Sequence, residues 1–95
     1  MPAYMISDVN VINAERYEDY LAAISEAVQK HGGRYLVRAH QTKVLEGNWN
    51  PARVVVIEFA SMADAERFYS SEQFLAAREL RQNVAMVNMI LAEGV

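Results

Sequence analysis

The sequence predicts an α+β fold in which a four-stranded antiparallel sheet carries helices on one face. Four short segments are rich in β-branched and other apolar side chains, which is typical of strands. Two longer segments repeat their apolar residues every three or four positions, as amphipathic helices do. In chain order these segments give β-α-β-β-α-β, the split βαβ arrangement of ferredoxin-like proteins. We therefore expect one ferredoxin-like domain that covers residues 1–95.

The first half of the chain is expected to contain a strand, a helix and a second strand. The first strand covers Ala3–Val11 and ends in a polar turn. A helix follows, with Asn13 as its N-cap and Gly32 in the left-handed position after its last turn. Its apolar face is expected to include Tyr17 and Tyr20. The second strand is predicted over Arg34–Glu46, directly after the glycine pair.

The second half is expected to repeat this pattern after a turn rich in Gly, Asn and Pro. A strand is predicted over Arg53–Ala60, where six apolar residues accompany a single carboxylate. The following helix begins after the N-cap Ser61 and is expected to break into two pieces at Ser70–Ser71. The last strand is predicted over Val84–Gly94.

The third and fourth strands do not alternate between apolar and polar residues. The runs "VVVIEF" and "VAMVNMIL" are largely apolar on both faces, which indicates that both faces of the sheet are buried. Two helices cover only one face, and 53% of the residues are hydrophobic, a high share for so short a chain. A second copy is the simplest cover for the other face, so we expect a homodimer that forms a dimeric α+β barrel.

Alternation along the strands places a polar group on the face predicted to meet the partner subunit. Its members are charged or amide side chains set among aliphatic ones: Asp8, Arg38, His40, Glu58 and Asn88. A one-residue slip or a bulge would reverse the face of any of them.

Two hypotheses about this polar group remain open. In the first, it lines a pocket for a small organic molecule, where Arg38 holds an anionic or carbonyl oxygen and His40 or Glu58 moves a proton. Asp8 would then orient Arg38 or His40. In the second, the same charges form an ion-pair network that fixes the register of two sheets in a non-catalytic dimer. The sequence leaves open whether the protein is an enzyme.

The remaining polar residues are expected to have structural roles. His31 and His40 lie nine positions apart across a predicted turn, which is no recognised ligand spacing, so we expect no metal and no cofactor. Ser71 fits an N-cap. Arg81 suits the end of a helix or reaches back to the sheet. Trp49 is expected at an interface.

Composition excludes several classes of function. The chain has no cysteine, so disulfides, thiol nucleophiles and thiolate metal sites are excluded. Its net charge is −3 with no basic stripe, which argues against a nucleic-acid partner. No segment matches a signal peptide or a membrane helix, so we expect no membrane partner and a cytoplasmic location.

The chain resembles the uncharacterised family known as domain of unknown function 1330, of the dimeric α+β barrel superfamily, over essentially its whole length. The motifs that carry the resemblance are "HGGRYLVR" at 31–38, "LEGNW" at 45–49, "RVVVIEFAS" at 53–61, "AERFYSS" at 65–71 and the closing "EG" at 93–94. The chain departs from the family pattern at Ala39–His40, where relatives more often have glycines, and at Phe68, where they more often have tryptophan.

The resemblance implies a ferredoxin-like protomer, a homodimer with its sheets face to face, and a cavity between sheet and helices or between the sheets. The positions that the family pattern singles out are Gly32, Gly33, Arg34, Arg38, Glu46, Gly47, Glu58, Phe59, Tyr69, Ser71 and Arg81. By this resemblance Tyr69, Ser71 and Arg81 join Asp8 and Arg38 as expected ligand contacts. The wider superfamily includes cofactor-independent and haem-degrading monooxygenases, but a shared fold does not transfer chemistry.

Overall fold

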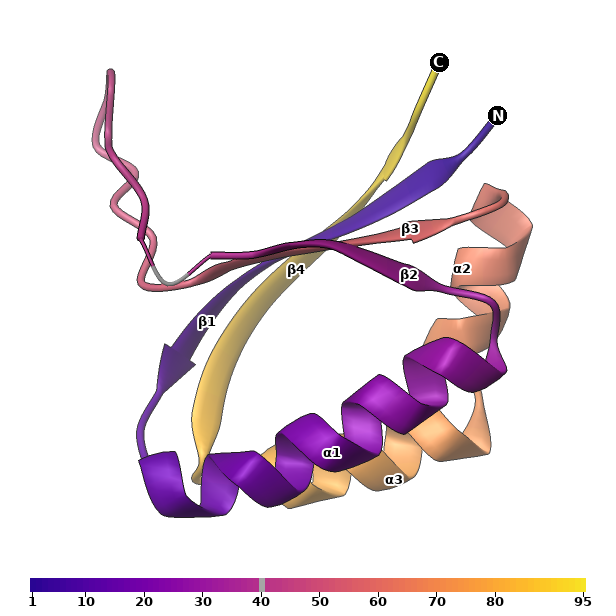
Figure 1. The fold of residues 1–95 in the computed structure, drawn as a ribbon, viewed down its shortest axis with the longest axis horizontal. Helices are drawn as coiled ribbons and strands as arrows, with labels where there is room; N and C mark the ends of the chain where they lie inside the picture. Colours follow the sequence, from indigo (N-terminus) through magenta and orange to yellow (C-terminus); the bar gives the residue numbers. More distant parts are fainter. Residues whose placement is uncertain (40) are drawn as a thin grey trace.

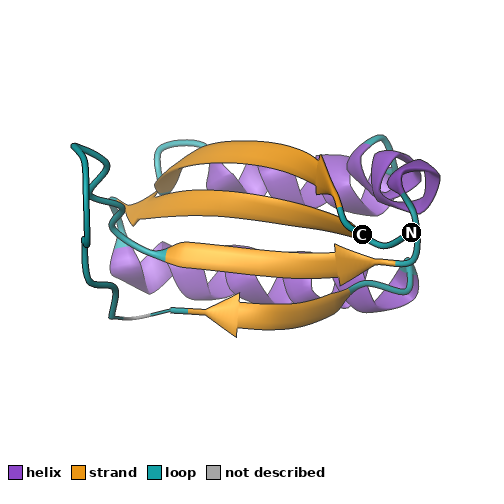
Figure 2. Ribbon diagram, turned by 90° about the horizontal axis from the view of Figure 1, so that it is seen from above, coloured by secondary structure: helices purple, strands orange, loops and turns teal. Residues whose placement is uncertain are grey.

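The protein is described by a computed structural model that covers residues 1–39 and 41–95. Within these ranges, the elements in chain order are β1 (Ala3–Val11), α1 (Ala14–Lys30), β2 (Arg34–Arg38), β3 (Val54–Phe59), α2 (Met62–Tyr69), α3 (Glu72–Arg81) and β4 (Ala85–Glu93). The strands form an antiparallel sheet in the order β2-β3-β1-β4. All three helices cover the same face of the sheet (Figures 1 and 2). The predicted ferredoxin-like fold is confirmed.

The helices begin where the sequence placed their caps. The side-chain oxygens of Asn13, Ser61 and Ser71 each accept the backbone N–H three residues further on, at 3.1 Å in every case. Ser71 therefore ends the break between α2 and α3, as predicted. Within the described ranges, no helix is both long and apolar enough to cross a membrane.

Aromatic rings fill the core between the sheet and the helices. The ring of Phe68 lies 5.1 Å from that of Phe59 and 5.2 Å from that of Phe74, and all three side chains are fully buried. The turn after α1 passes close to this cluster, because a Cβ at Gly33 would lie 2.8 Å from the Phe59 ring. Only glycine fits there without moving a buried ring.

The second strand is much shorter than predicted. It ends at Arg38 rather than at Glu46. Residues 41–50 are exposed and belong to no strand, and the segment up to β3 rises from the sheet on the side away from the helices (Figure 1). Its base is tied to β1, because the backbone N–H of Ala52 donates to Oδ1 of Asp8 at 3.1 Å.

A bulge in β2 corrects the predicted faces of this strand. The strand pairs with β3 up to Tyr35 and again from Val37, so Leu36 is an extra residue in the ladder. An extra residue reverses the alternation of all residues beyond it. Arg38 consequently lies opposite Val55, whose side chain packs against the core. The prediction that Arg38 faces the partner subunit is wrong, because it points to the helix side.

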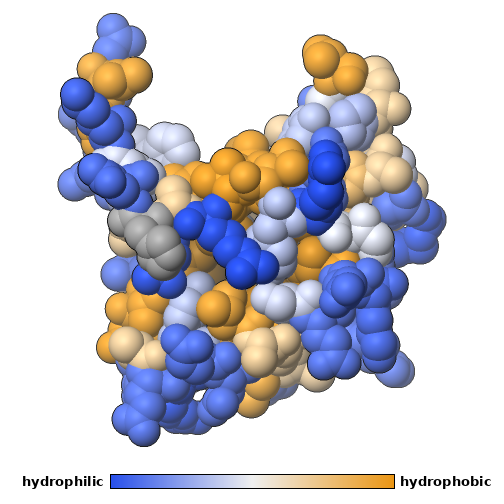
Figure 3. Space-filling model, in the orientation of Figure 1, coloured by the Kyte–Doolittle hydropathy of each residue, from blue (hydrophilic) through white to orange (hydrophobic). Residues whose placement is uncertain are grey.

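The outer face of the sheet is apolar and open. Met86 and Ile90 of β4 are 64% and 63% exposed, and Leu36 and Val37 of β2 are also exposed. Figure 3 shows apolar side chains along this side of the sheet, in a hollow between the rising segment and the two chain ends. The ends lie side by side, since the N–H of Gly94 donates to the carbonyl of Pro2 at 2.7 Å.

Candidate functional site

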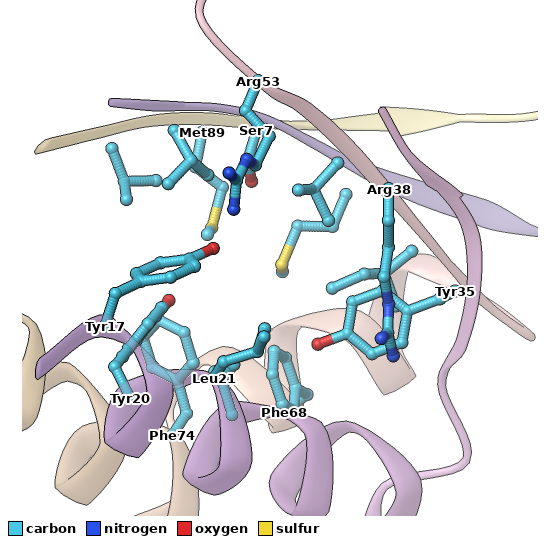
Figure 4. A pocket seen from close by; sticks show the side chains of 16 residues that line it. Ser7, Tyr17, Tyr20, Leu21, Tyr35, Arg38, Arg53, Phe68, Phe74 and Met89 are labelled. Atoms are coloured by element: carbon cyan, nitrogen blue, oxygen red, sulfur yellow. The ribbon is translucent and has the colours of Figure 1, made fainter. Parts of the chain in front are cut away.

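A cavity of about 140 Å³ lies between the inner face of the sheet and helix α1. Most of its wall is apolar and comes from β1, β3, β4 and the helices. Six polar side chains also line it: Ser7, Tyr17, Tyr20, Tyr35, Arg38 and Arg53. Figure 4 shows the Tyr17 hydroxyl and the Arg53 guanidinium pointing into the space. An apolar cavity with a few convergent polar groups is the usual form of a small-molecule site.

Two arginines line this cavity, Arg38 at the end of β2 and Arg53 directly before β3. Arg38 lies opposite Val55, and Arg53 precedes it by two positions on the same strand face, so the arginines are diagonal neighbours. The guanidinium carbon of Arg38 lies 3.9 Å from the centre of the Tyr35 ring. That of Arg53 lies 5.4 Å from the centre of the Tyr17 ring. These contacts are within cation–π range and hold both cations against the aromatic wall.

Among residues 1–39 and 41–95, no carboxylate balances these two charges at the cavity. None of its lining residues among those described is acidic. Neither Arg38 nor Arg53 forms a salt bridge with a residue of the described ranges. Guanidinium groups recognise carboxylates with paired hydrogen bonds. The cavity therefore favours an anionic ligand.

Burial favours the neutral form of two tyrosines in the wall, Tyr20 and Tyr35. Burial raises the pKa of Tyr20, and the neighbouring Arg81 only partly opposes this effect. Burial also raises the pKa of Tyr35, against the lowering effects of its hydrogen bond to Ser25 and of the Arg38 charge. The two hydroxyl oxygens of Tyr35 and Ser25 are 3.4 Å apart. At neutral pH these phenols keep their protons and can donate hydrogen bonds to a ligand.

The structure does not bring the predicted polar group together. Glu58 lies on the outer face, where its Oε1 accepts from Nη2 of Arg34 at 2.7 Å. Asp8 is also on the outer face, beside Asn88 of β4, and Arg38 is on the inner one. Asp8 therefore cannot orient Arg38 as expected, because the sheet lies between them. His40 lies outside the described residues.

The three ligand contacts that the family resemblance added, Tyr69, Ser71 and Arg81, lie around α2 and α3. The hydroxyl of Ser71 is occupied as the N-cap of α3 and donates to the carbonyl of Phe68 at 2.7 Å. Tyr69 lines a second cavity near β4. Arg81 lies behind the first cavity, with its guanidinium carbon 5.9 Å from the Tyr20 ring. Its Nη1 atom is buried and has no hydrogen-bond partner among the described residues.

Sequence reasoning missed Arg53 and assigned the tyrosines to the core. The sequence did contain a signal for Arg53. Alternate residues of a strand share a face, and Arg53 lies two residues before the inner-face residues Val55, Ile57 and Phe59. Tyr17 and Tyr20 were expected on the apolar face of α1, and they do lie there, buried. Their hydroxyl groups were the signal that this face of α1 borders a cavity with polar groups as well as the packed apolar core.

Solved structures of several proteins share this fold. A protein of unknown function from Rhodopseudomonas palustris is 18% identical, with 99% of this chain and 82% of that one covered and a TM-score of 0.78. SnoaB, a cofactor-independent oxygenase from Streptomyces nogalater, is 13% identical, with 99% and 93% covered and a TM-score of 0.72. A dimeric protein of unknown function with a ferredoxin-like fold, from Bacteroides fragilis, is 13% identical, with 98% and 96% covered and a TM-score of 0.62. Identities this low indicate a shared fold alone.

No curated protein matches the chain. The family comparison, in contrast, covers nearly every residue, including the strand arginines and the segment between β2 and β3. By its match over residues 2–95, the chain belongs to the family described as "Domain of unknown function (DUF1330)".

Proposed function

We propose that this protein binds a small aromatic acid in the cavity between its sheet and helices, and that it does so as a homodimer. The observation that carries the proposal is the pair Arg38 and Arg53, two cations without a described acidic partner at one apolar cavity. A carboxylate on the ligand would supply the missing negative charge.

The size and the walls of the cavity support a ligand with one ring. A cavity of about 140 Å³ is close to the size that accepts a benzene ring in a protein core, roughly 150 Å³. Aromatic side chains line it on the helix side, and rings favour tilted or stacked contacts with one another. The hydroxyls of Tyr17 and Tyr20 offer hydrogen bonds to a polar substituent.

The function that we propose is binding. Proton abstraction needs a base within reach of the ligand, and the described wall carries hydroxyls and guanidinium groups but no carboxylate. Glu58, which the sequence suggested for this role, is on the outer face and paired with Arg34.

The homodimer is supported by the open apolar outer face. Exposed side chains such as Met86 and Ile90 form a surface of the kind that marks protein interfaces. A second copy related by twofold symmetry would present the same surface in return. One protein of the same fold, that from Bacteroides fragilis, is described as dimeric.

Binding of benzoate, measured by isothermal titration calorimetry, tests the ligand class. Loss of a charge-assisted hydrogen bond costs about 1.5–3 kcal/mol, so we expect Arg53→Ala to weaken binding by about tenfold or more. Arg38→Ala should act in the same direction but less strongly, because Arg38 is exposed to water. Arg67→Ala is the matched control, because Arg67 pairs with Asp64 on the surface of α2. Equal affinities in all three variants would contradict the proposal.

A second candidate is a non-catalytic structural dimer without a ligand. The observation that favours it is the ion pair between Arg34 and Glu58 on the outer face, which would be enclosed by a partner subunit. On this hypothesis Glu58→Gln weakens the dimer and benzoate does not bind to the wild type. Sedimentation velocity and the same titration distinguish the two.

A further inference from the structure

A second cavity, of about 230 Å³, lies beside the first at the β4 edge of the sheet. Its apolar lining comes from Met5 of β1 and from Met89, Ile90 and Leu91 of β4. Two polar residues of α2, Glu66 and Tyr69, complete it. Glu66 is exposed, which puts the acidic group of this cavity in contact with water.

Two methionines separate the cavities. Met5 and Met89 line both of them. In the sheet, Met5 lies opposite Leu91, two residues from Met89, so the methionines are diagonal neighbours on the inner face. Methionine has three rotatable side-chain bonds and adapts its shape to its neighbours. A partition made of two methionines can therefore yield to a ligand more easily than one made of branched or aromatic side chains.

The charged residues that line the two cavities determine how an acidic ligand would be oriented. In the sheet order β2-β3-β1-β4, the arginines belong to the β2–β3 side and the methionines to the β1–β4 side. Glu66 lies beyond the methionines and would repel a carboxylate there. An acid group consequently belongs at the arginines, and the opposite end of the ligand must be neutral and apolar.

We infer that the ligand is an aromatic acid with an apolar substituent opposite its acid group, and that this substituent passes between Met5 and Met89 into the second cavity. The inference rests on the proposed function and narrows the ligand class. The ring occupies the first cavity, while a short alkyl or aryl group is buried against Leu91 and the ring of Tyr69. Tyr69 thereby acquires a ligand contact, although it is remote from the arginines.

The test compares benzoate with 4-butylbenzoate by calorimetry on the full chain. Each buried methylene is worth about a fourfold gain in affinity, so we expect the butyl compound to bind at least tenfold more tightly to the wild type. Leu91→Trp fills the second cavity and should reduce this ratio to below about threefold, with benzoate binding unchanged. Leu75→Trp is the matched control, because Leu75 lines neither cavity.

A second variant guards against misfolding of Leu91→Trp. Met89→Ala opens the partition and should raise the butyl-to-benzoate ratio by a further threefold or more. Met62→Ala, which removes a partly buried methionine outside both cavities, should leave the ratio unchanged.

The outcomes separate this inference from the proposed function. Benzoate binding with a ratio near one in the wild type and in Met89→Ala would overturn the two-cavity inference and leave the proposed function standing. A tenfold ratio that Leu91→Trp does not change would also overturn it, because the alkyl chain would then lie elsewhere. If neither acid binds, the proposed function fails and the inference fails with it.

Discussion

Burial raises the pKa of Tyr20 and Tyr35, so both hydroxyls stay protonated to a higher pH than free tyrosine does. Each is surrounded by apolar groups on the inner side of the sheet, and burial disfavours the phenolate form. Tyr35 is also stacked under the cation of Arg38. The pair places a neutral donor and a positive charge side by side, which is a combination suited to a carboxylate.

The raised pKa values predict that the protein loses stability in alkaline solution. Above the ordinary tyrosine value of 10.0, the unfolded chain releases phenolic protons that the folded protein keeps. The free energy of unfolding therefore falls as the pH rises from 10 toward the folded pKa values. Urea unfolding at pH 8, 10 and 11, followed by circular dichroism, measures this fall.

Removing one of these hydroxyls should make the free energy of unfolding decrease less steeply with rising pH. We expect Tyr35→Phe to lose less stability between pH 8 and pH 11 than the wild type does. Tyr69→Phe is the control, because Tyr69 is 45% exposed. A pH dependence as steep in Tyr35→Phe as in the wild type would contradict the assignment.

The identity of the site residues was only partly predictable. Arg38 was predicted to contact a ligand and lines the cavity. Its predicted face was wrong, because nothing in "RYLVR" distinguishes a bulge at Leu36 from a regular strand. The cavity itself depends on how the twisted sheet separates from α1, and residue patterns carry no information on that separation. The tyrosines consequently looked like ordinary core residues.

Among the elements, those with strong local signals were predicted best. The bounds of β1 agree with the prediction at both ends, and the caps at Asn13 and Ser61 lie where the sequence placed them. The caps depend on hydrogen bonds within three residues, so the local sequence determines them. The length of β2 depends instead on its pairing with β3, a contact between distant parts of the chain, and it was overestimated.

Close packing around Gly33, between α1 and β2, leaves no room for a side chain. Gly33→Ala places a methyl group against Phe59 and Val28, both fully buried. Overpacking of this kind typically costs about 1–3 kcal/mol, and chemical denaturation measures the loss. Phe59→Leu should relieve the clash, so the double variant is expected to be more stable than the sum of the two single changes. If the losses of stability in the two single variants simply add in the double variant, the methyl group does not clash with Phe59.

In the molecule as a whole, the two faces of the sheet carry different kinds of residue. The inner face carries the arginines and the cavities. The outer face carries exposed aliphatic residues and the Arg34–Glu58 pair. Because a strand alternates its side chains between faces, one strand can serve a ligand and a partner at once.

Self-association through the outer face predicts a monomer when that face is charged. Ile90→Lys introduces a cation at the centre of β4, where burial against a second copy would cost several kcal/mol. Analytical ultracentrifugation at micromolar concentration should give a dimer for the wild type and a monomer for this variant. Leu75→Lys, on α3, should remain dimeric. A wild-type monomer under these conditions would refute the homodimer.

The bulge at Leu36 has a further consequence, for aggregation. β2 is an edge strand, and its free backbone groups could pair with an edge strand of another molecule. The extra residue interrupts the regular spacing of those groups, and the strand is only five residues long. β4, at the other edge, is nine residues long and pairs with β1 without interruption. The bulge that turns Arg38 toward the cavity therefore also makes β2 a poor edge for pairing with another molecule. The edge more open to such pairing is β4.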